Sequence, residues 1–432
     1  MKLQSWGRFP TVDGTLHTPG SMQEMRSLLQ PQSTFNGIAR GLGRSYGDSA
    51  LADQVIRSTR LDHFQGFNPE TGMLRCSAGT SLADILRHFA PQGWFLPVLP
   101  GTRFVTVGGA IASDVHGKNH HLDGTFGTHI DSLRLMLANG DIVECSRISN
   151  PRLFHATCGG MGLTGIIVDA TLHLVRVPGS AVMQKTLRAE SLEDVMALFE
   201  ANAESTYSVA WIDCLARGSA MGRSLLYLGD HAHDNRFSAP RQGRLTVPVS
   251  APSLLLNRHT MHLFNSLYFK RPIKASERIE PGSYFFPLDG ISNWNRLYGK
   301  KGFLQYQFVV PTQGAQQAIA KVLQRTSTAG KGSFLSVLKK FGAGNNNLLS
   351  FPMHGYTLAM DFKWERNLFP LLDELDAIVL DHGGRLYLAK DARMSEQSFK
   401  RGYPRWEEFA SIRAEYQADT RFNSLQSRRL GL

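Results

Sequence analysis

The sequence predicts an α+β fold divided into two domains, and three observations support this prediction. The first third is dense in glycine and proline and carries short apolar runs, which is typical of short strands joined by turns. Helical patterns are few and lie mainly in the later part of the chain. The 432 residues exceed what one hydrophobic core usually holds, and the composition changes near Pro178-Gly179.

In the first part, short strands outnumber helices. Residues 130–138 and 142–146 flank Asn139-Gly140, a dipeptide that strongly favours a β-hairpin. An amphipathic helix is expected over 81–90, where it is ended by Gln92-Gly93. Further strands are expected at 74–78 and 166–175.

In the second part, helices alternate with longer strands. Ser191 followed by Asp194 is typical of a capped helix start, so a helix is expected from there through Ala203. Further helices are expected at 315–328 and 367–381, and strands at 304–310, 356–362 and 385–389. Residues 229–281 are polar, basic and weakly periodic, which predicts a long and poorly ordered loop.

Composition and charge narrow the class of protein. No stretch resembles about 20 uninterrupted apolar residues, and the first residues lack the apolar core of a secretion signal, so a cytoplasmic protein is expected. The four cysteines are widely spaced without a CxxC pair, which indicates buried thiols. The net charge of +11 favours polyanionic partners, either nucleic acid, anionic lipid or a phosphorylated substrate. The basic residues are scattered without a recognition motif, so no nucleic-acid partner is expected, and a generally solvated basic surface is the alternative.

Three glycine-rich stretches are candidates for a binding site. GLGRSYGD at 41–48 follows an apolar strand, and its backbone N–H groups could bind a pyrophosphate. At 97–113, small side chains would let a flat or extended ligand lie against the backbone. The stretch 158–165 contains GxGxxG, but the β-branched run that follows it excludes a Rossmann dinucleotide fold. Each stretch alone is more often a structural turn, whereas the three together favour a cofactor site.

A histidine cluster at 116–121, with Asp114 and Asp123 beside it, allows three interpretations. It could bind a metal, border a bound cofactor, or consist of surface histidines. No metal site is predicted, because no regular helix or strand would place the ligands on one face.

Lys390 ends an apolar strand, and Gln305 and Gln307 alternate onto one face of another. A lysine in an apolar pocket has a lowered pKa and can act as a base, while a charged lysine holds a phosphate or an alkoxide. The alternative is a surface lysine paired with Asp391. Two amides on one face suit sugar hydroxyls, although glutamines facing solvent at a sheet edge are also common.

Five longer motifs can be compared with known families: GLGRSYGD (41–48), PVLPGTRFVTVGGAIASDVHGKNHH (97–121), GGMGLTGIIVDATL (159–172), FFPLDGISNWNRLYGKKGFLQYQF (285–308) and GGRLYLAKDAR (383–393). With them the chain resembles the vanillyl-alcohol-oxidase-type FAD-binding superfamily over nearly its whole length. Within it, the chain is similar to a branch that oxidises polyprenyl-phosphoryl ribose. The resemblance implies an FAD-binding domain of two subdomains at 1–178, a substrate domain with an antiparallel sheet at 179–384, and a C-terminal return to the first domain at 385–432.

The resemblance also implies the residues that bind FAD. In covalent relatives a histidine bonds the flavin, and Arg44 stands at that position here, so non-covalent FAD is expected. The implied FAD contacts are Arg40, Gly41, Leu42, Gly43, Arg44, Ser45, Tyr46, Gly47, Pro100, Gly101, Thr102, Thr106, Val107, Gly108, Gly109, Ala112, Ser113, His116, Gly117, Asn119, Gly162, Gly165 and Ile167.

For catalysis, the resemblance implies that Lys390 and Tyr46 flank the reactive face of the flavin. The implied substrate contacts are His116, Lys118, Gln305, Gln307, Lys339, Thr357 and Lys390. Ala359 stands where mycobacterial members carry a pocket cysteine, so a thiol is not needed for turnover. Thr357 stands where the same members carry an asparagine close to that cysteine.

The activity implied by the resemblance is oxidation of the ribose 2-hydroxyl to a keto group. This would be the first half of a 2-epimerisation that feeds arabinose-containing cell-envelope glycans. An NAD(P)H-dependent reductase would be the partner enzyme, and a basic surface would contact an anionic membrane peripherally, at the inner membrane. The alternatives are an FAD-dependent oxidase or dehydrogenase of a soluble alditol or aldonolactone, and a nucleic-acid-binding protein without catalysis.

Overall fold

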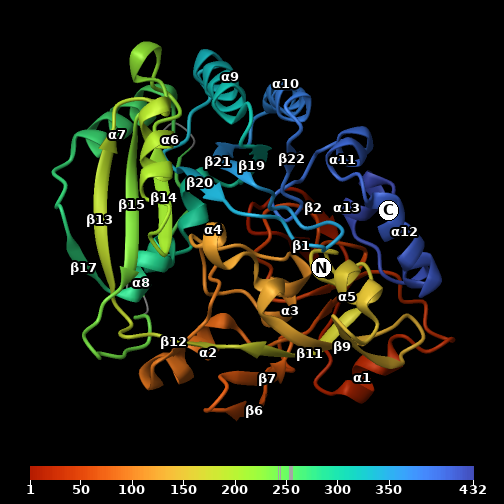
Figure 1. Cartoon of the computed structure of the whole chain (residues 1–432). Helices are drawn as coiled ribbons and strands as arrows, with labels where there is room; N and C mark the ends of the chain where they lie inside the picture. The colour runs from red at the N-terminus through yellow and green to blue at the C-terminus, as the bar shows by residue number, and fades with distance from the viewer. Residues whose placement is uncertain (242, 244, 253–255) are drawn as a thin grey trace.

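The structure is a computed structural model that describes residues 1–241, 243, 245–252 and 256–432. Its described strands fall into two groups that share no sheet, because strands up to residue 176 pair only with one another and so do strands from residue 182 onwards. Helices alternate with strands in both groups, which confirms the α+β fold. Figure 1 shows the long strands of the second group beside the mixed first part.

The first part contains four small sheets. The largest is antiparallel in the order β10-β9-β11-β7-β6, with strands β6 (Phe64–Asn68), β7 (Met73–Ser77), β9 (Ile130–Met136), β10 (Ile142–Ser146) and β11 (Ile166–His173). A parallel sheet joins β3 (Thr15–His17), β5 (Gln54–Arg57) and β4 (Ile38–Arg40). The two remaining pairs are β1 (Lys2–Gln4) with β2 (Thr11–Asp13), and β8 (Trp94–Phe95) with β12 (Val175–Arg176).

Short helices connect these strands: α1 (Met22–Ser27), α2 (Leu82–Phe89), α3 (Val107–Ala112), α4 (His120–Asp123) and α5 (Pro151–Thr157). The side chain of Ser81 accepts a hydrogen bond from the backbone of Asp84, which begins α2 as the sequence predicts. The predicted hairpin is confirmed, since β9 and β10 pair around Gly140, whose φ of +85° suits glycine.

The second part is built on an eight-stranded sheet in the order β17-β13-β15-β14-β20-β21-β19-β22. Its strands are antiparallel throughout: β13 (Val182–Ala189), β14 (Tyr207–Ile212), β15 (Ser224–His231), β17 (Glu277–Ile279), β19 (Phe303–Pro311), β20 (Ser336–Phe341), β21 (Gly355–Lys363) and β22 (Arg385–Leu386). This confirms an antiparallel sheet in the second part.

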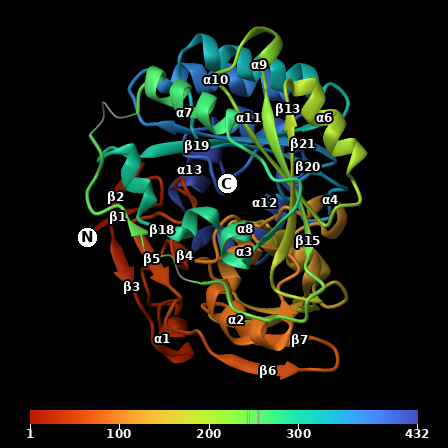
Figure 2. The same cartoon turned by 90° about the vertical axis from the view of Figure 1, so that its left-hand side faces the viewer.

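Helices α6 (Leu192–Ala201), α9 (Ala315–Thr328) and α10 (Leu368–Asp381) pack on this sheet. Helix α7 (Arg258–Lys270) packs through Phe269 on Trp211 of β14 and Leu225 of β15. The neighbouring residues of these two strands belong to the main core, so α7 lies on the opposite face of the sheet from that core. The later part also contains the short elements α8 (Pro281–Phe285), β16 (Leu245–Thr246) and β18 (Ile291–Ser292). Lys118 donates to the carbonyl of Tyr284, so α8 lies at the boundary with the first part. In Figure 2, α8 and α3 lie at this boundary.

The C-terminal helices return to the first part of the chain. They are α11 (Glu396–Gly402), α12 (Trp406–Glu415) and α13 (Leu425–Leu430). Phe422 forms a parallel bridge with Gly37, and the backbone N–H of Leu425 donates to the carbonyl of Leu51 at 2.7 Å. The buried guanidinium of Arg413 donates to the carbonyl of Leu163 at 3.0 Å. These contacts join the end of the chain to its beginning (Figure 1).

Two predictions for local structure are wrong. Residues 229–281 are not one irregular loop, since the end of β15, β16, α7 and β17 lie there, while residues 242, 244 and 253–255 of this segment are outside the described residues. The strand predicted at 385–389 ends at Leu386, because the chain then forms a turn. In this turn the backbone N–H of Lys390 donates to the carbonyl of Tyr387 at 3.0 Å. The predicted helix at 315–328 is confirmed at both ends.

Candidate active site

A cavity of about 1060 Å³ lies between the first part of the chain and one face of the eight-stranded sheet. The loops after β4 and before α3 form one side, and strands β14, β19, β20 and β21 form the other. Pockets for single small molecules are typically about 300–1,000 Å³. The cavity is therefore large enough for an extended cofactor together with part of a second molecule.

The loop that follows β4 lines the cavity from Arg40 through Tyr46. Gly43 has a left-handed φ of +64°, which glycine tolerates without strain. Among the described residues, the backbone N–H groups of Leu42, Gly43 and Arg44 donate no hydrogen bond. Neighbouring free amides of this kind favour an anionic group such as a pyrophosphate.

The other two glycine-rich stretches line the same cavity. Thr106 begins α3 by accepting a hydrogen bond from the backbone N–H of Gly109 at 3.1 Å, so the small residues of α3 form a regular wall. The predicted residues of these stretches that line the cavity are Pro100, Gly101, Thr102, Thr106, Gly108, Gly109, Ala112, Ser113, His116, Gly117, Gly162, Gly165 and Ile167. The structure thus brings all three stretches to one space.

Four predicted site residues do not line the cavity wall. A Cβ atom at Gly47 would overlap the carbonyl oxygen of Asp391, so this glycine permits close packing behind the wall. Val107 is fully buried in the core. The Asn119 amide donates to the carbonyl of Pro97 at 2.7 Å, and Thr357 accepts from a cavity residue rather than lining the cavity itself.

Lys390 lies in the turn that follows β22, with its Nζ 3.8 Å from the centre of the Tyr46 ring. The backbone N–H of Tyr46 donates to the carbonyl of Ala389 at 3.0 Å, so the first glycine-rich loop is joined to this turn. Burial lowers the pKa of Lys390 to about 8, and the charge of Asp361 acts in the opposite direction. The site therefore holds an amine that can gain or lose a proton close to neutral pH.

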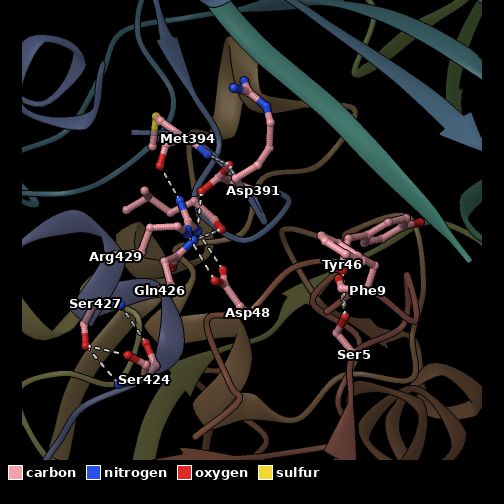
Figure 3. Close-up of polar contacts among 12 residues, drawn as sticks. Ser5, Phe9, Tyr46, Asp48, Asp391, Met394, Ser424, Gln426, Ser427 and Arg429 are labelled. Atoms are coloured by element: carbon pink, nitrogen blue, oxygen red, sulfur yellow. Dashed lines mark hydrogen bonds and ion pairs between the residues drawn. The ribbon is translucent and has the colours of Figure 1, made fainter. Parts of the chain in front are cut away.

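Arg429 of α13 anchors the turn that carries Lys390. It donates to Asp391 and to Asp48 at 2.8 Å each, and Gln426 donates to the main chain of the same turn, as Figure 3 shows. The alternative in which Lys390 is a surface residue paired with Asp391 is wrong, because the partner of Asp391 is Arg429 and Lys390 lines the cavity.

Gln305 and Gln307 both face the cavity, as their alternation in β19 predicts. The amide of Gln305 donates to Asp361 at 2.6 Å, and that of Gln307 lies 3.3 Å from the Thr357 hydroxyl and 3.2 Å from His116 Nε2. With the Gln307 amide nitrogen facing His116 Nε2, as in this structure, the ring nitrogen accepts, an arrangement that suits the tautomer protonated on Nδ1. Burial and the charge of Lys339 hold the pKa of His116 well below its usual value, so this ring is neutral.

His116 Nδ1 is buried and has no partner among the described residues. An N–H donor left without an acceptor is costly in a folded protein, so this atom is suited to a bound group that brings an acceptor. Among the residues that the structure describes, His116 is the only histidine on the cavity wall, and no group of three His, Cys, Asp or Glu side chains is arranged to hold a metal.

Two further lysines line the sheet side of the cavity. Burial lowers the pKa of Lys118 and of Lys339 to about 7 each, and the charge of Lys339 further lowers the pKa of Lys118 while that of Lys390 further lowers the pKa of Lys339. Lys118 donates to the carbonyl of Tyr284 and lies 4.2 Å from the centre of its ring. Together with Lys390, these amines give the cavity a positive potential in their protonated forms, and a bound anion would favour those forms by raising the pKa values of the amines.

Several residues in or behind the cavity wall have no local sequence signal. Asp361 is buried beside Gln305 and Tyr298, and burial raises the pKa of its carboxyl to about 7. Trp211 and Phe264 line the same space from β14 and α7. The strand register sets Gln307 opposite Ala359, Ala359 opposite Val337, and Val337 opposite Trp211, a row that only the folded sheet brings together. The four cysteines are free and buried away from the cavity.

The class of protein follows from a match to a known domain family. The family described as FAD binding domain matches residues 16–146, which include two of the three glycine-rich stretches. With the two-part α+β architecture, this makes the chain an FAD-dependent oxidoreductase of the vanillyl-alcohol-oxidase type that acts on CH–OH groups.

The chain belongs to the decaprenylphosphoryl-β-D-ribose oxidase family. It is 37% identical to the Mycolicibacterium smegmatis decaprenylphosphoryl-β-D-ribose oxidase, over 100% of this chain and 97% of that protein. It is 34% identical to an uncharacterised Streptomyces coelicolor protein over 79% of this chain and 97% of that protein. The similarity to bovine L-gulonolactone oxidase, at 30% identity, covers 45% of this chain and 44% of that enzyme.

The residues present fit FAD. Free amides at Leu42, Gly43 and Arg44 suit the pyrophosphate, and the small side chains of α3 leave space for a flat ring. The unpartnered Nδ1–H of His116 offers a donor on the same wall. FAD is therefore the cofactor of this chain, consistent with the matched domain.

Proposed function

We propose that the chain oxidises the ribose 2-hydroxyl of a polyprenyl-phosphoryl ribose to the 2-keto sugar with FAD. The observation that carries the proposal is the polar row on the sheet face, where Gln305, Gln307 and Lys339 face the same cavity as the glycine-rich loops. Family membership over the whole chain supports it, because the similarity extends through the sheet that forms this side. The gulonolactone oxidase similarity covers less than half of the chain, so it gives a soluble aldonolactone or alditol less support.

The chemistry that bound FAD supplies is acceptance of the hydride from ribose C2. The hydroxyl proton leaves separately, to Lys390 itself or to water that Lys390 holds. A pKa of about 8 suits this task, because about a tenth of the amine is neutral at pH 7, far more than for an ordinary lysine, and the ammonium can release its proton to solvent afterwards. Tyr46 supports the amine through its ring face at 3.8 Å.

The remaining cavity residues bind and orient the sugar. The amide of Gln307 is already fixed by Thr357 and His116, so its carbonyl oxygen has a defined direction for a sugar hydroxyl. Lys118 and Lys339 are cations at low pH and suit the substrate phosphate or a developing alkoxide.

FAD is proposed to bind without a covalent bond. Arg44 stands where covalent relatives carry the bonding histidine, and its guanidinium lies 4.4 Å from the centre of the Trp6 ring. The His116 ring is engaged with Gln307. Acid precipitation should release the yellow colour into the supernatant. Colour that stays in the pellet would contradict non-covalent binding.

The wider assignments are proposals as well. An FAD-binding domain at 1–178 with the return at 385–432, and a substrate domain at 179–384, are supported by the two groups of strands up to residue 384, whereas β22 at the start of the return still pairs with β19 of the later sheet. A separate NAD(P)H-dependent reductase would convert the keto sugar to the arabino product for cell-envelope glycans. The four unpaired thiols suit a cytoplasmic location, and the charge of +11 suits peripheral contact with the anionic inner membrane. No described helix is long and apolar enough to cross a bilayer.

The test is a panel of substrates scored by bleaching of the flavin absorbance without oxygen. Polyprenyl-phosphoryl ribose should bleach the flavin, whereas xylitol and gulonolactone should leave it oxidised. Bleaching by the soluble compounds alone would favour the alternative of an alditol or aldonolactone oxidase.

A further inference from the structure

Helix α7 carries an unusual outer face. Its inner face is fixed, because the amide of buried Asn265 donates to Asp213 at 2.8 Å and Phe269 packs in the sheet-side cluster. On the outer face, Leu263 and Leu267 are 61% and 64% exposed, and their spacing of four residues places them on one side of the helix. Lys270 continues this side one turn further and is also exposed.

The charge of the surrounding segment has one sign. Residues 235–276 contain seven lysines and arginines and no aspartate or glutamate. Two more exposed apolar side chains lie in this segment, with Leu245 at 68% and Val249 at 69% exposure. Exposed leucines on a segment whose own charged side chains are all cationic match an anionic lipid interface, where apolar side chains enter the headgroup region and the cations contact phosphates.

This surface borders the mouth of the cavity. Phe264 is 43% exposed and also lines the cavity, as do Tyr268 of the same helix and Arg271, which directly follows the helix. Ser292 is exposed and also lines the cavity, and its strand pairs with the strand that contains Leu245. A molecule that lies partly in a membrane and partly in the cavity would pass beside these exposed lining residues.

We propose that the outer face of α7, defined by Leu263, Leu267 and Lys270, docks the chain on an anionic membrane. Docking places the cavity mouth against the headgroups, so that the polyprenyl chain of the substrate stays in lipid while its sugar phosphate enters. The inference rests on the proposed function for the nature of the substrate, but the docking itself is measurable without substrate.

The test is sedimentation of the purified flavoprotein with vesicles. It should bind phosphatidylglycerol–phosphatidylcholine vesicles, bind pure phosphatidylcholine far less, and dissociate at high salt. The paired change Leu263→Gln with Leu267→Gln should weaken binding by about tenfold or more, because two leucines no longer transfer to lipid. Ile148→Gln is the matched control, since Ile148 is 95% exposed in the first part of the chain. It should leave binding unchanged.

Flavin absorbance and reduction by a short-chain, water-soluble prenyl-phosphoryl ribose should be the same in all three proteins. Equal binding to both vesicle types, unchanged binding in the paired leucine variant, or self-association through these leucines in place of vesicle binding would overturn the docking proposal. If vesicle binding behaves as expected while no prenyl-phosphoryl ribose reduces the flavin, the docking surface stands and the proposed function fails.

Discussion

At the scale of single residues, the proposed proton transfer depends on the pKa of one buried amine, that of Lys390. Burial lowers the pKa of Lys390 to about 8, while Asp361 opposes this shift. Asp361 is held by Gln305 at 2.6 Å, so its position relative to the amine is fixed by the sheet. Burial explains why a lysine, whose ordinary pKa is far above neutrality, can exchange a proton under physiological conditions, and Asp361 limits how far the pKa falls.

Replacing Lys390 with alanine removes this amine and leaves the glycine-rich loops intact. We expect FAD to stay bound and the rate of flavin reduction by substrate to fall by about 10²–10⁴, the usual contribution of a positioned base. Stopped-flow absorbance measures both quantities in one sample. Normal reduction in this variant would remove Lys390 from the mechanism.

The pH dependence follows from the same pair. Only the neutral amine accepts a proton, so the rate of flavin reduction should rise with pH through about 8. Asp361→Asn removes the charge that raises the pKa of Lys390, so the midpoint of the profile should move to lower pH. A midpoint that stays in place or moves to higher pH would contradict this electrostatic coupling.

At the scale of elements, the turn carrying Lys390 depends on a helix from the far end of the chain. Arg429 on α13 bridges Asp48 from the first glycine-rich loop and Asp391 from the turn, and both carboxylates are buried (Figure 3). Removing the cation would leave two buried carboxylates close together, which is strongly unfavourable.

We therefore expect Arg429→Met to lower the free energy of unfolding by about 3–5 kcal/mol and to weaken FAD retention. Arg428→Met is the matched control, because its partner is Asp53 and these side chains are 44% and 62% exposed. An exposed pair of this kind contributes about 0–1 kcal/mol. Urea unfolding followed by circular dichroism measures both variants, and equal losses would contradict the role of Arg429.

The same scale shows what sequence reasoning can and cannot predict. Periodicity predicted the helix at 315–328 because one of its faces is buried and the other is polar. It missed α7 because Leu263 and Leu267 are apolar on the exposed side, which blurs the pattern. Asp361 was missed because a lone carboxylate in a strand gains its role only from the register with Gln305.

At the scale of the whole molecule, the active site exists only where distant segments meet. The glycine-rich loops come from the first part of the chain, the polar row comes from the later sheet, and the C-terminal helices fasten the two. Sequence motifs predicted which segments gather, since glycine loops and the lysine turn have local signatures. The depth of the cavity and the position of Phe264 and Tyr268 of α7 at its wall depend on tertiary packing, which local sequence patterns do not predict.

The most direct test of the central claim is anaerobic mixing of the purified protein with polyprenyl-phosphoryl ribose that carries deuterium at C2. If the ribose 2-hydroxyl is oxidised, the flavin absorbance bleaches and the product is a 2-keto sugar from which the C2 deuterium is lost. A protein without flavin absorbance, or a flavin that stays oxidised in excess substrate, would contradict the account.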